Sequence, residues 1–179
     1  MSLRDKYFLE AVPKLKEDLK IKNDLEAPRV SRIVVNTGIG KIADQENLVK
    51  AIVADLNKIT GQKPIFTLAK KAISGFKLKQ GSPVGVLVTL RGRRMWEFLE
   101  RLIVATLPRI KDFQGVGERN FNSSGDCSVG IKEQTVFPEI NPDETNFIFG
   151  LEVSLVTTAK SKKEGMALLK ALGFPVRGD

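Results

Sequence analysis

The amino-terminal part of the chain changes from helical periodicity to strand periodicity. Apolar residues recur at helical spacing through residues 1–22, which predicts a charged amphipathic helix that Pro13 breaks or kinks. Residues 30–37 alternate, so that Ile33 and Val35 share one face of a predicted strand and polar neighbours share the other. The chain therefore begins with a cover helix and a first strand.

The pattern of the next segment predicts a helix, followed by two strands that a long loop connects. Apolar positions over 48–59 lie on one helical face, and Gly61 lies where a left-handed cap would end that helix. Strands are predicted over 65–69 and 84–91, the second with strict alternation. Residues 72–83, rich in glycine, lysine and proline, are expected to form a mobile basic loop.

The second half continues with the same two periods. A helix that starts near Arg93 is expected to bury Trp96, Leu99 and Ile103 and to stop before Pro108. Further elements are predicted as strands over 128–136 and 149–157 and a last helix over 162–172. Strands with one apolar and one polar face, interspersed with amphipathic helices, predict an α+β fold. We expect a mainly antiparallel sheet with helices packed on one face, in two layers, as a single domain over 1–179.

Composition restricts the chemistry that the chain can perform. The apolar fraction of 42% and the charged fraction of 28% are typical of a globular protein. Histidine is absent and Cys127 is the only cysteine, which removes the usual general base, the usual triads and a zinc site. Most catalytic templates therefore fail, and we expect no metal and no cofactor. With no signal-like or membrane-spanning run, we expect a cytoplasmic protein.

Basic charge is concentrated in one segment. Between Asp55 and Glu97 there is no acidic residue, whereas the other parts of the chain balance their 20 cations against all 21 acidic residues. The nine cations of this segment are Lys58, Lys63, Lys70, Lys71, Lys77, Lys79, Arg91, Arg93 and Arg94. Such a concentration predicts contacts with phosphates, so nucleic acid is the first candidate partner.

Polar side chains on the strand faces opposite the core support this prediction. They are Arg32, Asn36, Thr67, Thr89 and Arg91. Alone they would be ordinary solvent-facing residues, but beside the basic segment they favour an RNA-binding face. Since aromatic residues are few in that segment, recognition of folded RNA by shape and backbone is favoured over stacking of unpaired bases.

Two other kinds of protein remain as alternatives. Residues 38–43 follow a strand and match G-x-G-x-x-A, which would suit a small enzyme that binds a nucleotide. The acidic residue expected about 20 positions later is Asp55, which lies inside a predicted helix, so the match is weak. The second alternative is a free-standing RNA- or DNA-binding module, such as a regulator or chaperone.

An acidic block follows the basic segment. Residues 112–158 hold eight acidic residues against only Arg119 and Lys132. This block is either a solvated face or a site for a basic protein, and the turn at 141–144 is its expected contact tip.

The sequence resembles the family of large-subunit ribosomal proteins numbered five, the L-five proteins that bind 5S rRNA, in bacterial form. Residues 56–72, LNKITGQKPIFTLAKKA, fit the family signature throughout. Shorter matches extend over the chain, at 28–30, 36–40, 75–77, 88–92, 95–98, 108–110 and 137–140. One departure is Cys127, where bacterial relatives usually carry an aromatic residue.

The resemblance implies a non-catalytic structural protein of the central protuberance that contacts 5S rRNA and large-subunit rRNA and binds no small-molecule substrate. Asn36, Gln62 and Thr89 match family positions that contact 5S rRNA. Together with the charge pattern, the expected rRNA-binding residues are Arg29, Arg32, Asn36, Gln62, Lys63, Thr67, Lys70, Lys71, Thr89 and Arg91.

The resemblance also assigns roles to the basic loop and the acidic block. The loop at 72–83 would reach the elbow of peptidyl-site tRNA through Phe76, Lys77, Lys79, Gln80, Gly81 and Ser82. The region 112–146 would bridge to a basic protein of the small-subunit head through Asp112, Asp143 and Glu144.

Overall fold

The computed structural model describes residues 1–76, 78–111, 113–145 and 147–177. The chain divides into two compact units, each made of segments that are distant in sequence. Unit 1 comprises Met1–Ile33, Arg91–Val129 and Ser154–Asp179, and unit 2 comprises Val34–Leu90 and Gly130–Val153.

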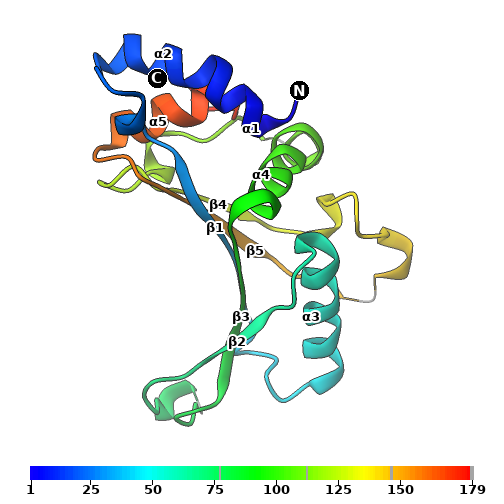
Figure 1. Ribbon diagram of the computed structural model, residues 1–179. Helices are drawn as coiled ribbons and strands as arrows, with labels where there is room; N and C mark the ends of the chain where they lie inside the picture. The colour runs from blue at the N-terminus through cyan, green and yellow to red at the C-terminus, as the bar shows by residue number, and fades with distance from the viewer. Residues whose placement is uncertain (77, 112, 146, 178–179) are drawn as a thin grey trace. The chain divides into compact units, whose positions relative to one another are not determined.

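The fold class is α+β, as predicted. The helices are α1 (Leu3–Lys6), α2 (Val12–Leu19), α3 (Glu46–Thr60), α4 (Gly92–Arg101) and α5 (Lys162–Ala171). The strands are β1 (Val30–Gly38), β2 (Ile65–Leu68), β3 (Pro83–Leu90), β4 (Cys127–Ile131) and β5 (Leu151–Thr157). In the described part of the chain these strands form one antiparallel five-stranded sheet in the order β2-β3-β1-β5-β4 (Figure 1).

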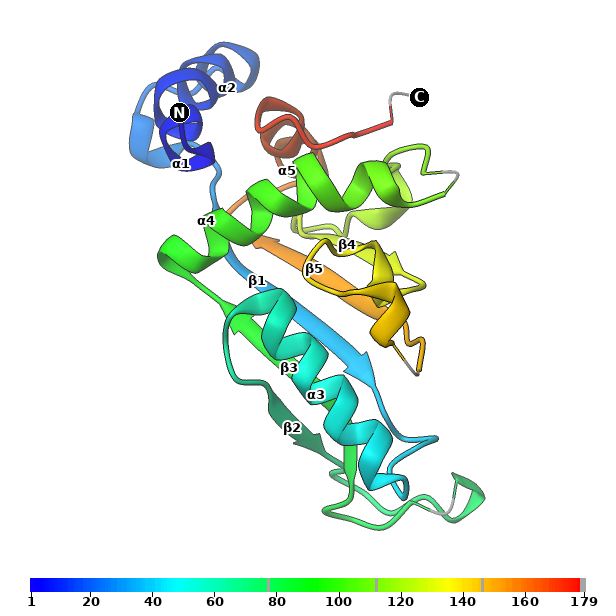
Figure 2. The same ribbon diagram turned by 90° about the vertical axis from the view of Figure 1, so that its right-hand side faces the viewer.

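In unit 2, helix α3 packs on one face of β3 (Figure 2). The helix buries Ile52, Leu56 and Ile59, as its apolar periodicity predicts. On β3, Val86 and Val88 are buried. Gly61 ends the helix in the left-handed conformation with φ of +65°, and its amide donates to the carbonyl of Asn57.

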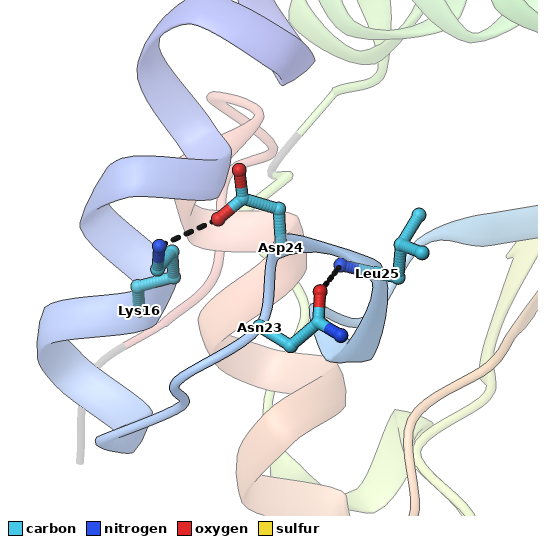
Figure 3. A network of polar contacts seen from close by, with 4 residues as sticks. All are labelled: Lys16, Asn23, Asp24 and Leu25. Carbon is cyan, nitrogen blue, oxygen red and sulfur yellow. Dashed lines mark hydrogen bonds and ion pairs between the residues drawn. The ribbon is translucent and has the colours of Figure 1, made fainter.

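In unit 1, helix α1 contacts α4 and helix α2 contacts α5. The turn that leaves α2 is fixed by polar contacts (Figure 3). Lys16 Nζ lies 2.5 Å from Asp24 Oδ1, and Asn23 Oδ1 accepts from the amide of Leu25 at 3.0 Å. These contacts place the chain for its entry into β1.

Two prolines change helix geometry without ending the helices. Pro13 has no N–H to donate to the carbonyl of Leu9, and the preceding residues Tyr7–Ala11 form a π-helical turn that leads directly into α2. The same occurs at Pro108, where a π-helical turn at Leu102–Thr106 is followed by a 3₁₀ turn at Leu107–Arg109. The α-helix predicted to start near Arg93 therefore ends before Pro108 as expected, at Arg101, although π-helical and 3₁₀ turns continue to Arg109.

The buried face of α4 is shifted relative to the prediction. Met95, Phe98 and Leu99 are buried on α4, whereas Trp96 and Ile103 are only half-buried. Trp96 instead lies beside Tyr7, with ring centroids 5.5 Å apart. The tryptophan is thus available at the surface of unit 1.

The strand predicted over 128–136 ends at Ile131, and Gln134 begins a 3₁₀ turn. The Gln134 side chain is fully buried, yet both ends of its amide are paired. Its Nε2 donates to the carbonyl of Phe147 at 2.6 Å, and its Oε1 accepts from the amide of Phe149 at 2.9 Å. The side chain therefore fixes the base of the loop that carries the acidic turn.

Cys127 is fully buried at the start of β4, where burial raises the pKa of its thiol to about 12. It remains a protonated packing residue at neutral pH.

None of the helices in the described segments is long and apolar enough to span a membrane. Within the same segments, acidic and cysteine side chains do not gather in threes as metal ligands would.

Candidate nucleic-acid interface

The pairing of β2 with β3 defines a sheet face in unit 2 that points away from α3. Ile65 pairs with Leu87 and Thr67 pairs with Gly85. Opposed residues of an antiparallel pair share a face, so these four lie opposite to Val86, whose face packs on the helix. Thr89 is on the same outer face, because it lies two residues from Leu87.

Gly85 brings polar residues of three strands together. A Cβ at Gly85 would lie 2.6 Å from Thr67 Oγ1 and 3.5 Å from Asn36 Oδ1. The missing side chain thus allows Thr67 of β2 and Asn36 of β1 to flank β3 closely. The sequence pattern predicted Asn36 and Thr67 for this face but not Gly85, although a glycine inside an alternating strand often marks a close approach.

Gln62 reaches the same strand from the end of α3. Its Nε2 donates to the backbone carbonyl of Thr89 at 3.1 Å. The turn that positions Gln62 is held by Thr60, whose Oγ1 donates to the carbonyl of Leu56 at 2.7 Å and accepts from the amide of Gln62 at 3.3 Å. The structure therefore joins Gln62 and Thr89, which are 27 residues apart.

Cations border this face along β2. Lys63, Lys70 and Lys71 are exposed, and no ion pair is recorded for them within the described segments. Large apolar side chains are exposed beside them, with Ile65 61% and Leu68 57% accessible. Exposed cations and exposed apolar groups together suit a partner that offers both phosphates and flat apolar surfaces.

The remaining predicted cations of the rRNA set belong to unit 1. Arg29 and Arg91 are exposed and Arg32 is half-buried. The backbone of Arg29 is fixed, because its amide donates to Thr158 Oγ1 at 3.0 Å and its carbonyl accepts from the Thr158 amide at 2.9 Å. Arg91 precedes the first turn of α4.

The basic loop is closed by backbone pairing. At its base the Ala69 amide donates to the Ser82 carbonyl and the Gly81 amide donates to the Ala69 carbonyl, both at 2.9 Å. Farther out, Ile73 and Leu78 bond each other at 2.9 and 3.1 Å, and Ser74–Phe76 form a 3₁₀ turn. Lys79, Gln80 and Gly81 are exposed, and Ser82 is half-buried. Lys77 and the side chain of Phe76 lie outside what the structure describes.

The acidic turn is an ordered feature of unit 2. Pro142–Glu144 form a 3₁₀ turn, in which Asn141 Oδ1 accepts from the amide of Asp143 at 3.2 Å. Asp143 and Glu144 are both exposed. Asp112 lies outside the described residues.

The turn at residues 38–44 lacks the geometry of a pyrophosphate site. It lines a cavity of about 820 Å³ with Ile52, Val84 and Phe149, so the walls offer mainly apolar groups. Gly38 and Gly40 have no positive φ, and α3 begins only at Glu46, whose charge would repel a phosphate. The nucleotide-enzyme alternative therefore loses its structural basis.

Two family models match the chain. Residues 23–79 match the model of ribosomal protein L5, and residues 83–176 match the model of the C-terminus of the same ribosomal family. These ranges contain the sheet face, the bordering cations, the acidic turn and the basic loop apart from residues 80–82. The chain therefore belongs to the ribosomal protein L5 family, whose members are structural, non-catalytic proteins of the large ribosomal subunit that associate with rRNA.

Proposed function

We propose that this protein binds 5S rRNA through the outer sheet face of unit 2. The observation that carries the proposal is the row of Asn36, Gly85 and Thr67 across three strands, bordered by exposed lysines that form no ion pair with the described residues. Gln62 and Thr89 extend the polar surface along β3.

The chemistry of this face suits folded RNA. Amide and hydroxyl side chains offer both donors and acceptors, which match 2′-hydroxyls, phosphates and base edges. The neighbouring lysines neutralise phosphates and release counterions. The side chains of the polar row come from paired strands, so their spacing is set before the RNA arrives and little conformational entropy is lost on binding.

Binding of the purified protein to 5S rRNA and to a size-matched structured RNA, measured across a salt series, tests the proposal. The double variant Asn36→Ala, Thr89→Ala should lose roughly 10-fold of its 5S affinity, since each neutral hydrogen bond contributes about 0.5–1.5 kcal/mol. With about five phosphate contacts, log affinity should fall against log salt with a slope near −4 to −5. Asn47→Ala, an exposed residue of α3, serves as the matched control.

Equal binding of both RNAs, unchanged in the double variant, would contradict the proposal. It would instead favour a free-standing, general nucleic-acid-binding module. A nearly flat salt dependence would also contradict the phosphate footprint.

We further propose that the chain acts as one ribosomal domain in the cytoplasm, within the central protuberance. The basic loop would contact peptidyl-site tRNA through Lys79, Gln80 and neighbouring residues, and its exposed cation supports this role. The ordered turn with Asp143 and Glu144 would receive a basic protein of the small-subunit head.

Reciprocal charge reversals on reconstituted subunits test these two contacts. Lys79→Glu should weaken binding of tRNA in the peptidyl site and leave subunit association unchanged. Asp143→Lys with Glu144→Lys should weaken subunit association, by roughly 10-fold if each lost charge pair contributes up to about 1 kcal/mol. Each variant is the control for the other. Unchanged association in the acidic-turn variant would exclude the bridging role.

A further inference from the structure

A separate pocket in unit 1 combines cations with aromatic rings. Its volume is about 380 Å³, and its lining includes Arg4, Arg29 and Arg93 together with Tyr7, Phe8 and Trp96. Among the described residues that line it, none is acidic. The pocket therefore offers positive charge and flat apolar surface in one place.

The rings of the pocket are already arranged around Tyr7. Tyr7 is buried, and its hydroxyl donates to the carbonyl of Pro28 at 3.1 Å. Phe8 meets Tyr7 edge-on with ring centroids 5.1 Å apart, and Trp96 meets it at 5.5 Å with an interplanar angle of 36°. Tyr7 thus positions Phe8, which is 58% exposed, and the half-buried Trp96.

Local backbone geometry explains why these side chains converge. The π-helical turn at Tyr7–Ala11 places both Tyr7 and Phe8, and π-helical turns are frequently found at functional sites. On the other side, α4 begins at Gly92 with φ of +58° and has Arg93 in its first turn, without an acidic residue or a side-chain cap. The positive end of this helix adds to the charge of the arginines.

The arginines differ in their availability. Arg93 is held by Glu97, with Nε 2.6 Å from Oε1, so part of its charge is already compensated. Arg4 and Arg29 are exposed, and none of the ion pairs recorded for the described residues involves them. An anion that enters the pocket would therefore be bound mainly by these two side chains.

We propose that this pocket holds one unpaired nucleotide of the bound RNA, with its base against Phe8 and Trp96 and its phosphate between Arg4 and Arg29. The volume admits a single nucleotide and is too small for a duplex. A base can stack on an exposed ring irrespective of its sequence. The inference rests on the proposed RNA-binding function but uses residues outside the unit 2 face.

Trp96 gives a direct signal, because it is the only tryptophan of the chain. We would titrate the full-length protein with four probes. These are an RNA hairpin that carries a single-nucleotide bulge, the same hairpin fully paired, AMP, and an acidic peptide. The bulged hairpin should quench Trp96 fluorescence and bind roughly 10-fold more tightly than the paired one. Equal quenching of Trp96 by both hairpins would overturn the proposal. So would quenching by AMP when neither hairpin quenches. Quenching by an acidic peptide but not by the bulged hairpin would do so as well.

Variants locate the effect. Phe8→Ala should remove the preference for the bulged hairpin, whereas Leu9→Ala, an adjacent residue that is 68% exposed, should keep it. Arg4→Ala should weaken binding of the bulged hairpin, in contrast to Lys14→Ala on α2. A preference that persists in both Phe8→Ala and Arg4→Ala would overturn the proposal.

The two proposals can fail independently. The double variant Asn36→Ala, Thr89→Ala should keep the preference for the bulged hairpin while it loses 5S affinity. Conversely, selective 5S binding by the wild-type protein without any preference for the bulge would reject the pocket and leave the proposed function intact.

Discussion

Replacement of Gly165 by alanine is expected to destabilise the protein by about 3 kcal/mol, at the upper end for overpacking of a close contact. Gly165 lies in α5 against the turn at Gly125, within unit 1. An added Cβ would collide with the carbonyl oxygen of Gly125 and would lie 2.7 Å from the Gly125 Cα. Both are backbone atoms, so the collision cannot be relieved by a side-chain rotation.

The sign of this effect makes the prediction specific. Inside an ordinary helix, glycine to alanine stabilises by about 1 kcal/mol, because alanine has the higher helix propensity. Urea unfolding of Gly165→Ala should show the opposite, a lower midpoint with an unchanged slope. Gly40→Ala is the control, since a Cβ there would meet nothing within 4 Å. A midpoint equal to or above that of the wild type would show that α5 does not approach Gly125 this closely.

The second large effect is expected at Gly85. Gly85→Val should separate Thr67 from Asn36, because even the first added carbon would lie 2.6 Å from Thr67 Oγ1 and 3.2 Å from the carbonyl oxygen of Thr37. Loss of two polar contacts to RNA, each at the upper end of about 0.5–1.5 kcal/mol, would lower 5S affinity roughly 100-fold. Valine favours strands, so a loss of stability would arise from crowding and not from propensity.

A coupled variant separates crowding from recognition. Thr67→Ala removes the hydroxyl nearest to the added carbon, so Gly85→Val with Thr67→Ala should recover much of the melting temperature but not the 5S affinity. Gly130→Val on β4 is the matched control, because a Cβ at Gly130 meets nothing within 4 Å. If Gly85→Val binds 5S rRNA as tightly as the wild type does, the polar row of Asn36, Gly85 and Thr67 is not part of the RNA interface.

Secondary structure was predictable wherever one pattern dominated. The alternation around Val35 and around Val88 predicted β1 and β3, and the apolar periodicity before Gly61 predicted α3 and its cap. At Pro13 and Pro108 the sequence predicted where regular α-helix is interrupted but not the form of the interruption. A proline removes a hydrogen-bond donor, but packing of the flanking helix faces keeps the helical path and inserts a π-helical turn instead.

By itself, the sequence determined the fold class, the concentration of basic charge around Lys63, Lys70 and Lys71, and the family signature, because these depend on composition and on local periodicity. Only the tertiary structure decided that Gly85 lies between Thr67 and Asn36, that Gln62 bonds Thr89, and that Trp96 shares a pocket with Arg4 and Phe8. The physical reason is that strand register and helix packing join residues far apart in the chain, and such contacts leave no periodic signal in the sequence.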